Sequence, residues 1–138
     1  MTELSDIKFY DTSSLLLKAN TLFDEDEYFA ISSITLEELE NIKTSLSRDP
    51  DIKYAARKLL HCLDEHKGSY DIHIFKESML SPIKEKDLSI SNDMKILATA
   101  INYNQKIDKI IFVTNDLSLK VIANIFFDNI ISVEEDDD

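Results

Sequence analysis

The chain has 138 residues, of which 43% are hydrophobic and 30% charged, and this size and composition predict one soluble globular domain with a substantial core. Gly68 is the only glycine and Cys62 the only cysteine, which excludes glycine-rich phosphate-binding loops and internal disulfides. The formal net charge of −12 disfavours nucleic acids and other polyanions as partners unless a local basic patch or bridging metal ions intervene.

The chain shows no pattern typical of a targeting or membrane-spanning segment. Its first residues, "MTELSDIK", are acidic and polar, and no apolar run approaches the ~20 residues that a membrane-spanning helix needs. Together with the single cysteine, these observations predict a cytoplasmic protein with no membrane partner.

The predicted elements alternate between strand and helix from the start of the chain. An apolar, β-prone run predicts a short buried strand at 7–11, and a helix is expected at 13–20. A second strand is predicted at 28–32. It precedes a helix at 35–46, in which apolar residues recur at helical spacing, with Leu46 as the last of them.

The middle of the chain continues this alternation. A third helix is predicted at 51–67, and Gly68 is expected to end it. Alternating apolar residues predict a strand at 70–75. Residues 76–90 contain Pro82 and mixed charges, so they are expected to form a loop.

The last part of the chain begins with a predicted helix at 91–104, capped by Ser91 or Asn92. The remaining predicted elements are a strand at 109–114, a helix at 117–127 and a strand at 129–134. Alternating strands and helices with short connections predict a three-layer α/β/α fold with a five-stranded parallel sheet. A single domain is expected over 1–138, with an acidic tail from about 134.

Three aspartates are candidates for a site at the carboxyl edge of this sheet, where such folds bind their ligands. Asp11 ends the first strand, and Asp116 follows the strand at 109–114. Asp93 is expected in the first turn of its helix, where the helix dipole favours an acid. Each has a purely structural alternative, because Asp11 and Asp116 could serve as helix caps and Asp93 as an ordinary first-turn acid.

Helical periodicity separates the neighbouring acids Glu37 and Glu38. Glu38 shares a helix face with Ile42, beside the apolar stripe. Glu37 shares a face with Asn41 and Thr44 and is predicted to point to solvent. Glu38 is therefore the better candidate for a site, although a single glutamate of this kind is usually a surface acid.

Four carboxylates gathered at one sheet edge would repel one another, which predicts a raised pKa for at least one of them. Clusters of carboxylates usually bind hard cations such as Mg²⁺ or Mn²⁺. The chemistry expected with such a metal is hydrolysis of a phosphodiester. The three histidines lack zinc-like spacing, no nucleophile elbow is present, and the pattern around Asp11 does not match phosphotransfer domains.

Four short segments, "FYDTSSLL", "ITLEELENIK", "NDMKILATA" and "FVTNDLSLK", resemble the motif blocks of PIN domains, in the family order. The second and fourth blocks look most like the PIN domain of PhoH-type proteins. The resemblance covers about residues 7–133. It implies a metal-dependent ribonuclease on a five-stranded parallel sheet flanked by helices.

The resemblance also implies which residues form the site. Its acids correspond to Asp11, Glu38, Asp93 and Asp116, as catalytic residues and as ligands of Mg²⁺ or Mn²⁺. Ser13 and Thr114 correspond to polar residues that support the site. Ser118 stands where many members of the family carry a further Asp or Asn, so it is expected to support this side of the site only weakly.

Positive side chains concentrate in the second and third predicted helices, at Lys43, Arg48, Lys53, Arg57 and Lys58. Lys53 and Arg57 are four residues apart and lie on the same helix face. Together with Lys43, they are candidates for contacts with an RNA backbone. The alternative is an ordinary solvated helix face.

The function that follows from the residues and the resemblance is cleavage of single-stranded RNA by a Mg²⁺- or Mn²⁺-dependent endoribonuclease. Two alternatives remain open: an inactive PIN-fold scaffold that binds RNA or protein, and the toxin of a toxin–antitoxin pair. The implied partners, besides single-stranded RNA, are a second copy of the chain, an ATPase domain or an antitoxin.

Overall fold

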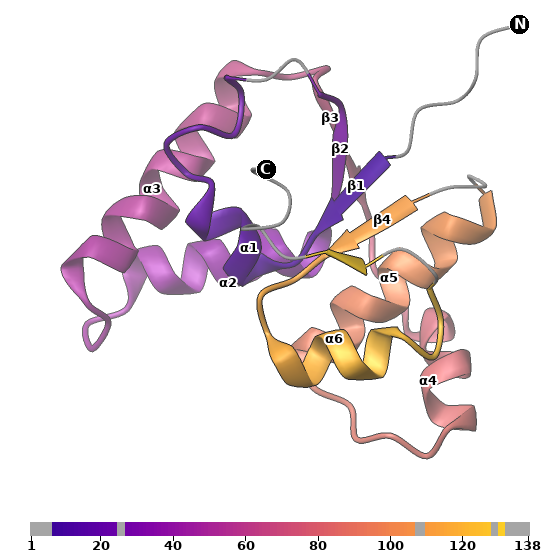
Figure 1. Ribbon diagram of the computed structural model, residues 1–138. Helices are drawn as coiled ribbons and strands as arrows, with labels where there is room; N and C mark the ends of the chain where they lie inside the picture. Colours follow the sequence, from indigo (N-terminus) through magenta and orange to yellow (C-terminus); the bar gives the residue numbers. More distant parts are fainter. Residues whose placement is uncertain (1–6, 25–26, 107–109, 128–129, 132–138) are drawn as a thin grey trace, which may run out of the picture.

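The computed structural model describes residues 7–24, 27–106, 110–127 and 130–131. Five parallel strands form one sheet in the order β3-β2-β1-β4-β5 (Figure 1). The strands are β1 (Ile7–Tyr10), β2 (Phe29–Ser32), β3 (Tyr70–His73), β4 (Ile110–Val113) and β5 (Ile130–Ile131). The predicted five-stranded parallel sheet flanked by helices is therefore confirmed.

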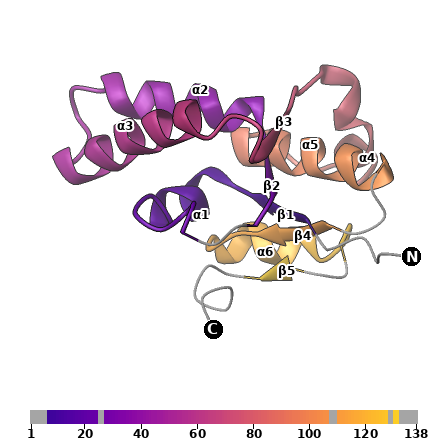
Figure 2. The ribbon, with the colours of Figure 1, turned by 90° about the horizontal axis from the view of Figure 1, so that it is seen from above.

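Helices cover both faces of the sheet. They are α1 (Thr12–Leu17), α2 (Ser33–Thr44), α3 (Pro50–Glu65), the 3₁₀ helix η1 (Glu77–Leu80), α4 (Ser81–Glu85), α5 (Asn92–Lys106) and α6 (Leu117–Ala123). Figure 2, which views the molecule from above, shows α2 and α3 side by side, as does Figure 1.

The strand period of two divides the core into two layers, because successive side chains point to opposite faces of the sheet. Phe9 and Phe112 belong to a cluster on one face that includes buried residues of α4, α5 and α6. Tyr10, Ile31 and Val113 belong to a cluster on the other face, with buried residues of α1, α2 and α3. The sheet is thus the middle of three layers.

The loop predicted at 76–90 is wrong, since η1 and α4 occupy much of it. Leu80 and Ile83 are buried in the core, which explains why this segment folds back onto the sheet. Pro82 stands in the first turn of α4, where a missing N–H breaks no helical hydrogen bond. Proline therefore starts this helix instead of interrupting it.

Several predicted ends differ from the structure. Helix α2 ends at Thr44, so Leu46 is fully exposed and not part of the apolar stripe. Helix α6 ends at Ala123, four residues before the predicted end. Helix α3 ends at Glu65, and Gly68 follows three residues later. Its φ of +93° is a conformation that glycine adopts without strain.

Two further predictions concern the helix at 91–104 and the end of the chain. The Ser91 hydroxyl accepts a hydrogen bond from the Met94 N–H, so Ser91 and not Asn92 caps α5. Of the strand predicted at 129–134, only Ile130–Ile131 is described. The acidic tail from about 134 lies outside the described residues.

Candidate active site

Strands β1 and β4 bring Asp11 and Thr114 side by side at the carboxyl edge of the sheet. Tyr10 and Val113 are register partners, so the next residue of each strand emerges at the same level. The backbone continues the ladder, since the Asp11 N–H donates to the Val113 carbonyl at 3.1 Å. The Thr114 hydroxyl donates to Oδ2 of Asp11 at 2.5 Å, within the range of charge-assisted hydrogen bonds.

Asp11 also serves as the N-cap of α1. Its backbone is extended, and its Oδ1 accepts the Ser14 N–H at 2.9 Å. The Ser13 hydroxyl lies 3.3 Å from both carboxylate oxygens, a weaker arrangement. Asp11 is only 2% exposed, so donors from two elements hold a nearly buried carboxylate in one orientation. The cap and the candidate site use the same side chain and do not exclude each other.

Asp116 follows β4 and, like Asp11, is both a helix cap and a candidate site residue. It caps α6, with Oδ1 accepting the Leu119 N–H at 3.1 Å. Its own N–H donates to Oγ1 of Thr114 at 3.1 Å. The Thr114 hydroxyl therefore links the two aspartates, donating to the side chain of Asp11 and accepting from the backbone of Asp116.

Glu38 reaches this edge from α2 and is half-buried. The Thr12 hydroxyl donates to its Oε1 at 2.6 Å and lies 3.2 Å from the hydroxyl of Thr35. Thr12 is buried, and the sequence analysis missed it. The only signal was that "DTSS" contains three hydroxyl residues, and a six-residue helix offers too little periodicity to tell which of them faces a neighbour.

Asp93 lies in the first turn of α5 and is half-buried. Burial raises the pKa of its carboxyl, and the negative charges of Glu38, Asp11 and Asp116 raise it further, in that order. The three charges that act on Asp93 belong to the other three candidate acids. A carboxylate with a raised pKa was expected from the sequence, although burial is the larger cause.

The four acids fit a hard divalent cation by donor type and by charge. Carboxylate oxygens are the preferred ligands of Mg²⁺ and Mn²⁺, and a cation would offset the mutual repulsion at Asp93. In the part of the chain that the structure describes, no three Asp, Glu, His or Cys side chains lie close enough to hold one ion together. Ion binding at this edge would therefore require the side chains to draw together.

A family model described as PIN domain matches residues 9–127, which is most of the chain. The chain belongs to the PIN-domain family. PIN domains have a nuclease-type fold and typically use divalent metals, and both properties agree with the acids at the carboxyl edge of this sheet. No curated protein matches the chain.

A polar groove extends from Glu38, one of the four candidate acids of this PIN domain, along α2. Its volume is about 290 Å³, and it is lined by Glu38, Asn41, Ile42, Ser45, Arg48 and Asn92. Asn41 was predicted to face solvent with Glu37. It is exposed, but it borders the same groove as Glu38, because residues three apart on a helix are also neighbours.

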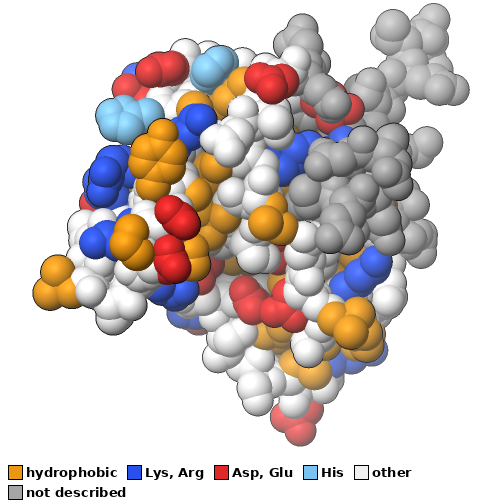
Figure 3. Space-filling view, turned by 60° about the vertical axis from the view of Figure 1, so that its left-hand side comes forward, with side chains coloured by type: hydrophobic (Ala, Val, Ile, Leu, Met, Phe, Trp, Pro, Cys, Tyr) orange, Lys and Arg blue, Asp and Glu red, His pale blue; other side chains and the backbone are white. Residues whose placement is uncertain are grey.

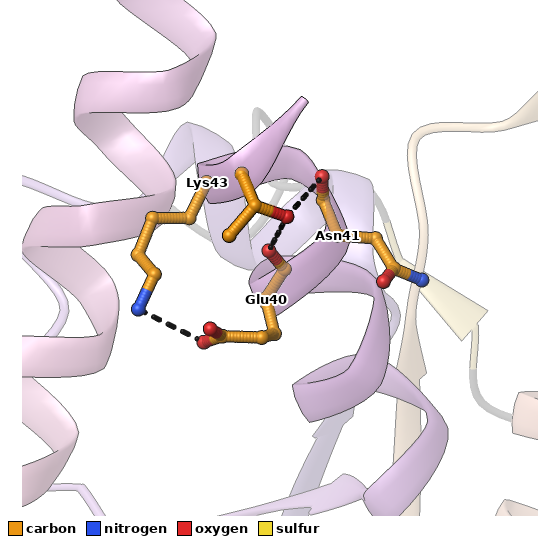
Figure 4. Close-up of polar contacts among 4 residues, drawn as sticks. Glu40, Asn41 and Lys43 are labelled. Carbon is orange, nitrogen blue, oxygen red and sulfur yellow. Dashed lines mark hydrogen bonds and ion pairs between the residues drawn. The ribbon is translucent and has the colours of Figure 1, made fainter. Parts of the chain in front are cut away.

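The predicted RNA-binding residues of the PIN domain lie away from this groove. Lys43 forms an ion pair with Glu40 at 3.0 Å, and Figure 4 shows both pointing away from the side chain of Asn41. Lys53 is half-buried and Arg57 exposed on α3. Lys58 donates to Oδ1 of Asn20 at 2.7 Å.

Basic side chains do not form a continuous surface on the face of the PIN domain in Figure 3. There, the described Lys and Arg side chains lie among acidic and hydrophobic ones. Arg48 belongs to neither helix, since α2 ends at Thr44 and α3 begins at Pro50.

Ser118 is exposed in α6, and among the described residues it makes no hydrogen bond to the four acids. No described helix is long and apolar enough to cross a membrane.

Proposed function

We propose that this PIN domain is a Mg²⁺- or Mn²⁺-dependent endoribonuclease that hydrolyses phosphodiester bonds in single-stranded RNA. The observation that supports it most strongly is electrostatic: the charges of Glu38, Asp11 and Asp116 all act on Asp93. Burial and the three neighbouring negative charges raise the pKa of Asp93, so its ionised form is costly for the fold without a cation. The choice of RNA as substrate rests on the family resemblance.

The side chains have distinct roles in this proposal. Asp11, Glu38, Asp93 and Asp116 would hold the metal. A divalent cation bound there would supply an activated water and neutralise the charge that develops on the phosphate. The Thr114 hydroxyl bonds Oδ2 of Asp11 and the Thr12 hydroxyl bonds Oε1 of Glu38, and these bonds orient the two carboxylates.

The PhoH-type subtype is proposed from the second and fourth sequence motifs. The proposed partners besides RNA are a second copy of the chain, an ATPase domain or an antitoxin. Lys53 and Arg57 are proposed to attract the RNA backbone from α3.

A second candidate function is a PIN-fold scaffold that binds RNA or protein without cleaving it. The observation that favours it is that no three ligand-type side chains among the described residues are close enough to hold an ion. The two functions differ in metal binding, because a scaffold does not need Mn²⁺ at its acids.

The test is a cleavage assay on a labelled single-stranded RNA in Mn²⁺ or in EDTA, with single-stranded DNA in parallel. Asp11→Asn should abolish cleavage and leave the fold intact, because asparagine also caps helices well. Asp64→Asn is the control, since it removes the same charge from an exposed part of α3. Cleavage that survives both Asp11→Asn and EDTA would overturn the proposed mechanism.

A further inference from the structure

The groove beside Glu38 has the size of a site for one small unit of a polymer. Its volume of about 290 Å³ is near the lower limit of roughly 300 Å³ for typical ligand sites. One nucleotide can occupy such a space, whereas a folded RNA element or a duplex cannot. The groove therefore suits an extended single strand.

The lining offers the three kinds of contact that a nucleotide uses. Arg48 supplies a guanidinium, which binds phosphate oxygens in a bidentate manner. The side-chain amides of Asn41 and Asn92 each carry donors and an acceptor, which can pair with the polar edge of a base. Ile42 adds an apolar contact for a base or sugar.

The position of the groove connects it with the acids. Glu38 belongs both to the groove and to the candidate active site, and Asn92 immediately precedes Asp93. A strand whose phosphate reaches the acids would therefore place a neighbouring nucleotide in the groove. Arg48 borders the groove beyond the end of α2, six residues along the chain from Ile42.

The charge distribution assigns the phosphate contact to Arg48. Among the described residues that line the groove, it is the only cation. The nearby Lys43 is paired with Glu40 on another side of α2 from Asn41 (Figure 4). Neither Asn41 nor Asn92 makes a side-chain hydrogen bond to another described residue, so both amides are available to a ligand.

We infer that this groove binds the nucleotide next to the scissile phosphate of a single-stranded RNA, with Arg48 on its phosphate and the amides of Asn41 and Asn92 on its base. The inference rests on the proposed function, because the acids define which phosphate is cleaved. It adds a binding site, and it makes the base in the groove a determinant of which position is cut.

The test compares Arg48→Ala with Lys67→Ala. Lys67 lies three residues before β3 begins, on the side of the amino ends of the strands and not of the carboxyl edge. Its substitution also removes one positive charge. In cleavage assays with Mn²⁺, Arg48→Ala should raise KM about tenfold with kcat nearly unchanged, the size expected for one charged hydrogen bond. Lys67→Ala should keep the KM of the wild type.

Binding is measured separately in the Asp11→Asn background, by fluorescence anisotropy of a labelled RNA at several salt concentrations. Arg48→Ala should reduce the slope of log Kd against log salt by about 0.7, the value for one phosphate contact on a single strand. Substitution of Asn41 or Asn92 by Ala should weaken the preference among oligo-A, oligo-C and oligo-U.

The outcomes separate this inference from the proposed function. If the wild type cleaves RNA but Arg48→Ala has the same KM and the same salt slope, the groove site is wrong and the nuclease stands. If the wild type cleaves nothing, the nuclease is wrong, and loss of binding on Arg48→Ala in the anisotropy assay would still support the nucleotide site. Equal base preference in the two Asn variants and the wild type would overturn the base contacts.

Discussion

Thr114 donates its hydroxyl proton to Oδ2 of Asp11 at 2.5 Å, although 103 residues separate them in the chain. The pairing of β1 with β4 makes this contact possible, because both residues directly follow register partners of the parallel ladder. The same hydroxyl accepts the N–H of Asp116. Thr114 therefore contacts both candidate metal ligands, Asp11 through its carboxylate and Asp116 through its backbone.

Thr114→Val is expected to impair the site more than the fold. It removes a hydroxyl that is fully buried and leaves both Asp11 and the Asp116 N–H without that partner, which costs about 1–3 kcal/mol of unfolding free energy. Mn²⁺ affinity should fall about tenfold or more, as second-layer substitutions at metal sites do. Calorimetric titration with Mn²⁺ and thermal unfolding measure the two effects.

The matched control for this variant is Thr99→Val. Thr99 is also fully buried, and its hydroxyl contacts Ser32 at 3.0 Å and the Lys95 carbonyl at 2.7 Å, not one of the four acids. It should lower thermal stability to a similar extent without changing Mn²⁺ affinity. Equal loss of Mn²⁺ affinity in both variants would mean that Thr114 acts only through general stability.

Thr12→Val should reduce RNA cleavage more than Ser13→Ala. The Thr12 hydroxyl is buried and bonds Oε1 of Glu38 at 2.6 Å, whereas the exposed Ser13 hydroxyl is 3.3 Å from Asp11. From these contacts we expect Thr12 to support the site more strongly than Ser13, the residue that the sequence suggested. The measurement is kcat/KM in Mn²⁺ for both variants, and a larger effect of Ser13→Ala would contradict it.

Asp93→Asn is expected to stabilise the metal-free protein at neutral pH. Because the folded state raises the pKa of Asp93 above its ordinary value of 3.8, it binds this proton more tightly than the unfolded state does. The stabilising contribution of the protonated form is present below pH 3.8 and is lost as pH rises through the raised pKa. In EDTA, Asp93→Asn should therefore raise Tm at pH 7, and the gain should shrink toward pH 3.5.

The control for this effect is Asp51→Asn, which also removes an acid from the first turn of a helix. Asp51 is exposed on α3, so its loss should lower Tm slightly, through the helix dipole, or leave it unchanged. A lower Tm for Asp93→Asn at pH 7 in EDTA would contradict the raised pKa that burial and the neighbouring acids give Asp93.

Most of the fold could be predicted from the sequence because its elements carry strong local signals. The strand β4 and the helix α5 have clear apolar patterns. The alternation of strands and helices along the chain predicted that the sheet is parallel. The segment at 76–90 was mispredicted because its helices are only four and five residues long and contain Pro82. Short elements that depend on burial of single residues, here Leu80 and Ile83, give almost no periodic signal.

The four acids could be selected from the sequence, since strand ends and helix faces follow from simple periodicity. Their hydrogen-bond partners were harder to find. Thr12 contacts Glu38 across 26 residues, and no local pattern reveals such a pair. The groove lined by Asn41, Arg48 and Asn92 depends on how α2 meets the start of α5, which only the three-dimensional structure provides.

Reversal of both charges in Lys53→Glu/Arg57→Glu should weaken RNA binding at low salt about tenfold, because two phosphate contacts of the strand would be lost. The matched control is Lys84→Glu/Lys86→Glu, which makes the same charge change at exposed positions in and just after α4. Anisotropy titrations of a labelled single-stranded RNA measure both. Unchanged affinity of the first variant would assign these residues to an ordinary solvated helix face.

In the proposed function, Asp11, Glu38, Asp93 and Asp116 form one metal site. Isothermal titration of Mn²⁺ into the wild type, Asp11→Asn and Asp64→Asn tests it most directly. We expect saturable binding to the wild type and to Asp64→Asn, and binding at least tenfold weaker to Asp11→Asn. Equal Mn²⁺ affinity in all three proteins, or no binding to the wild type, would contradict the claim.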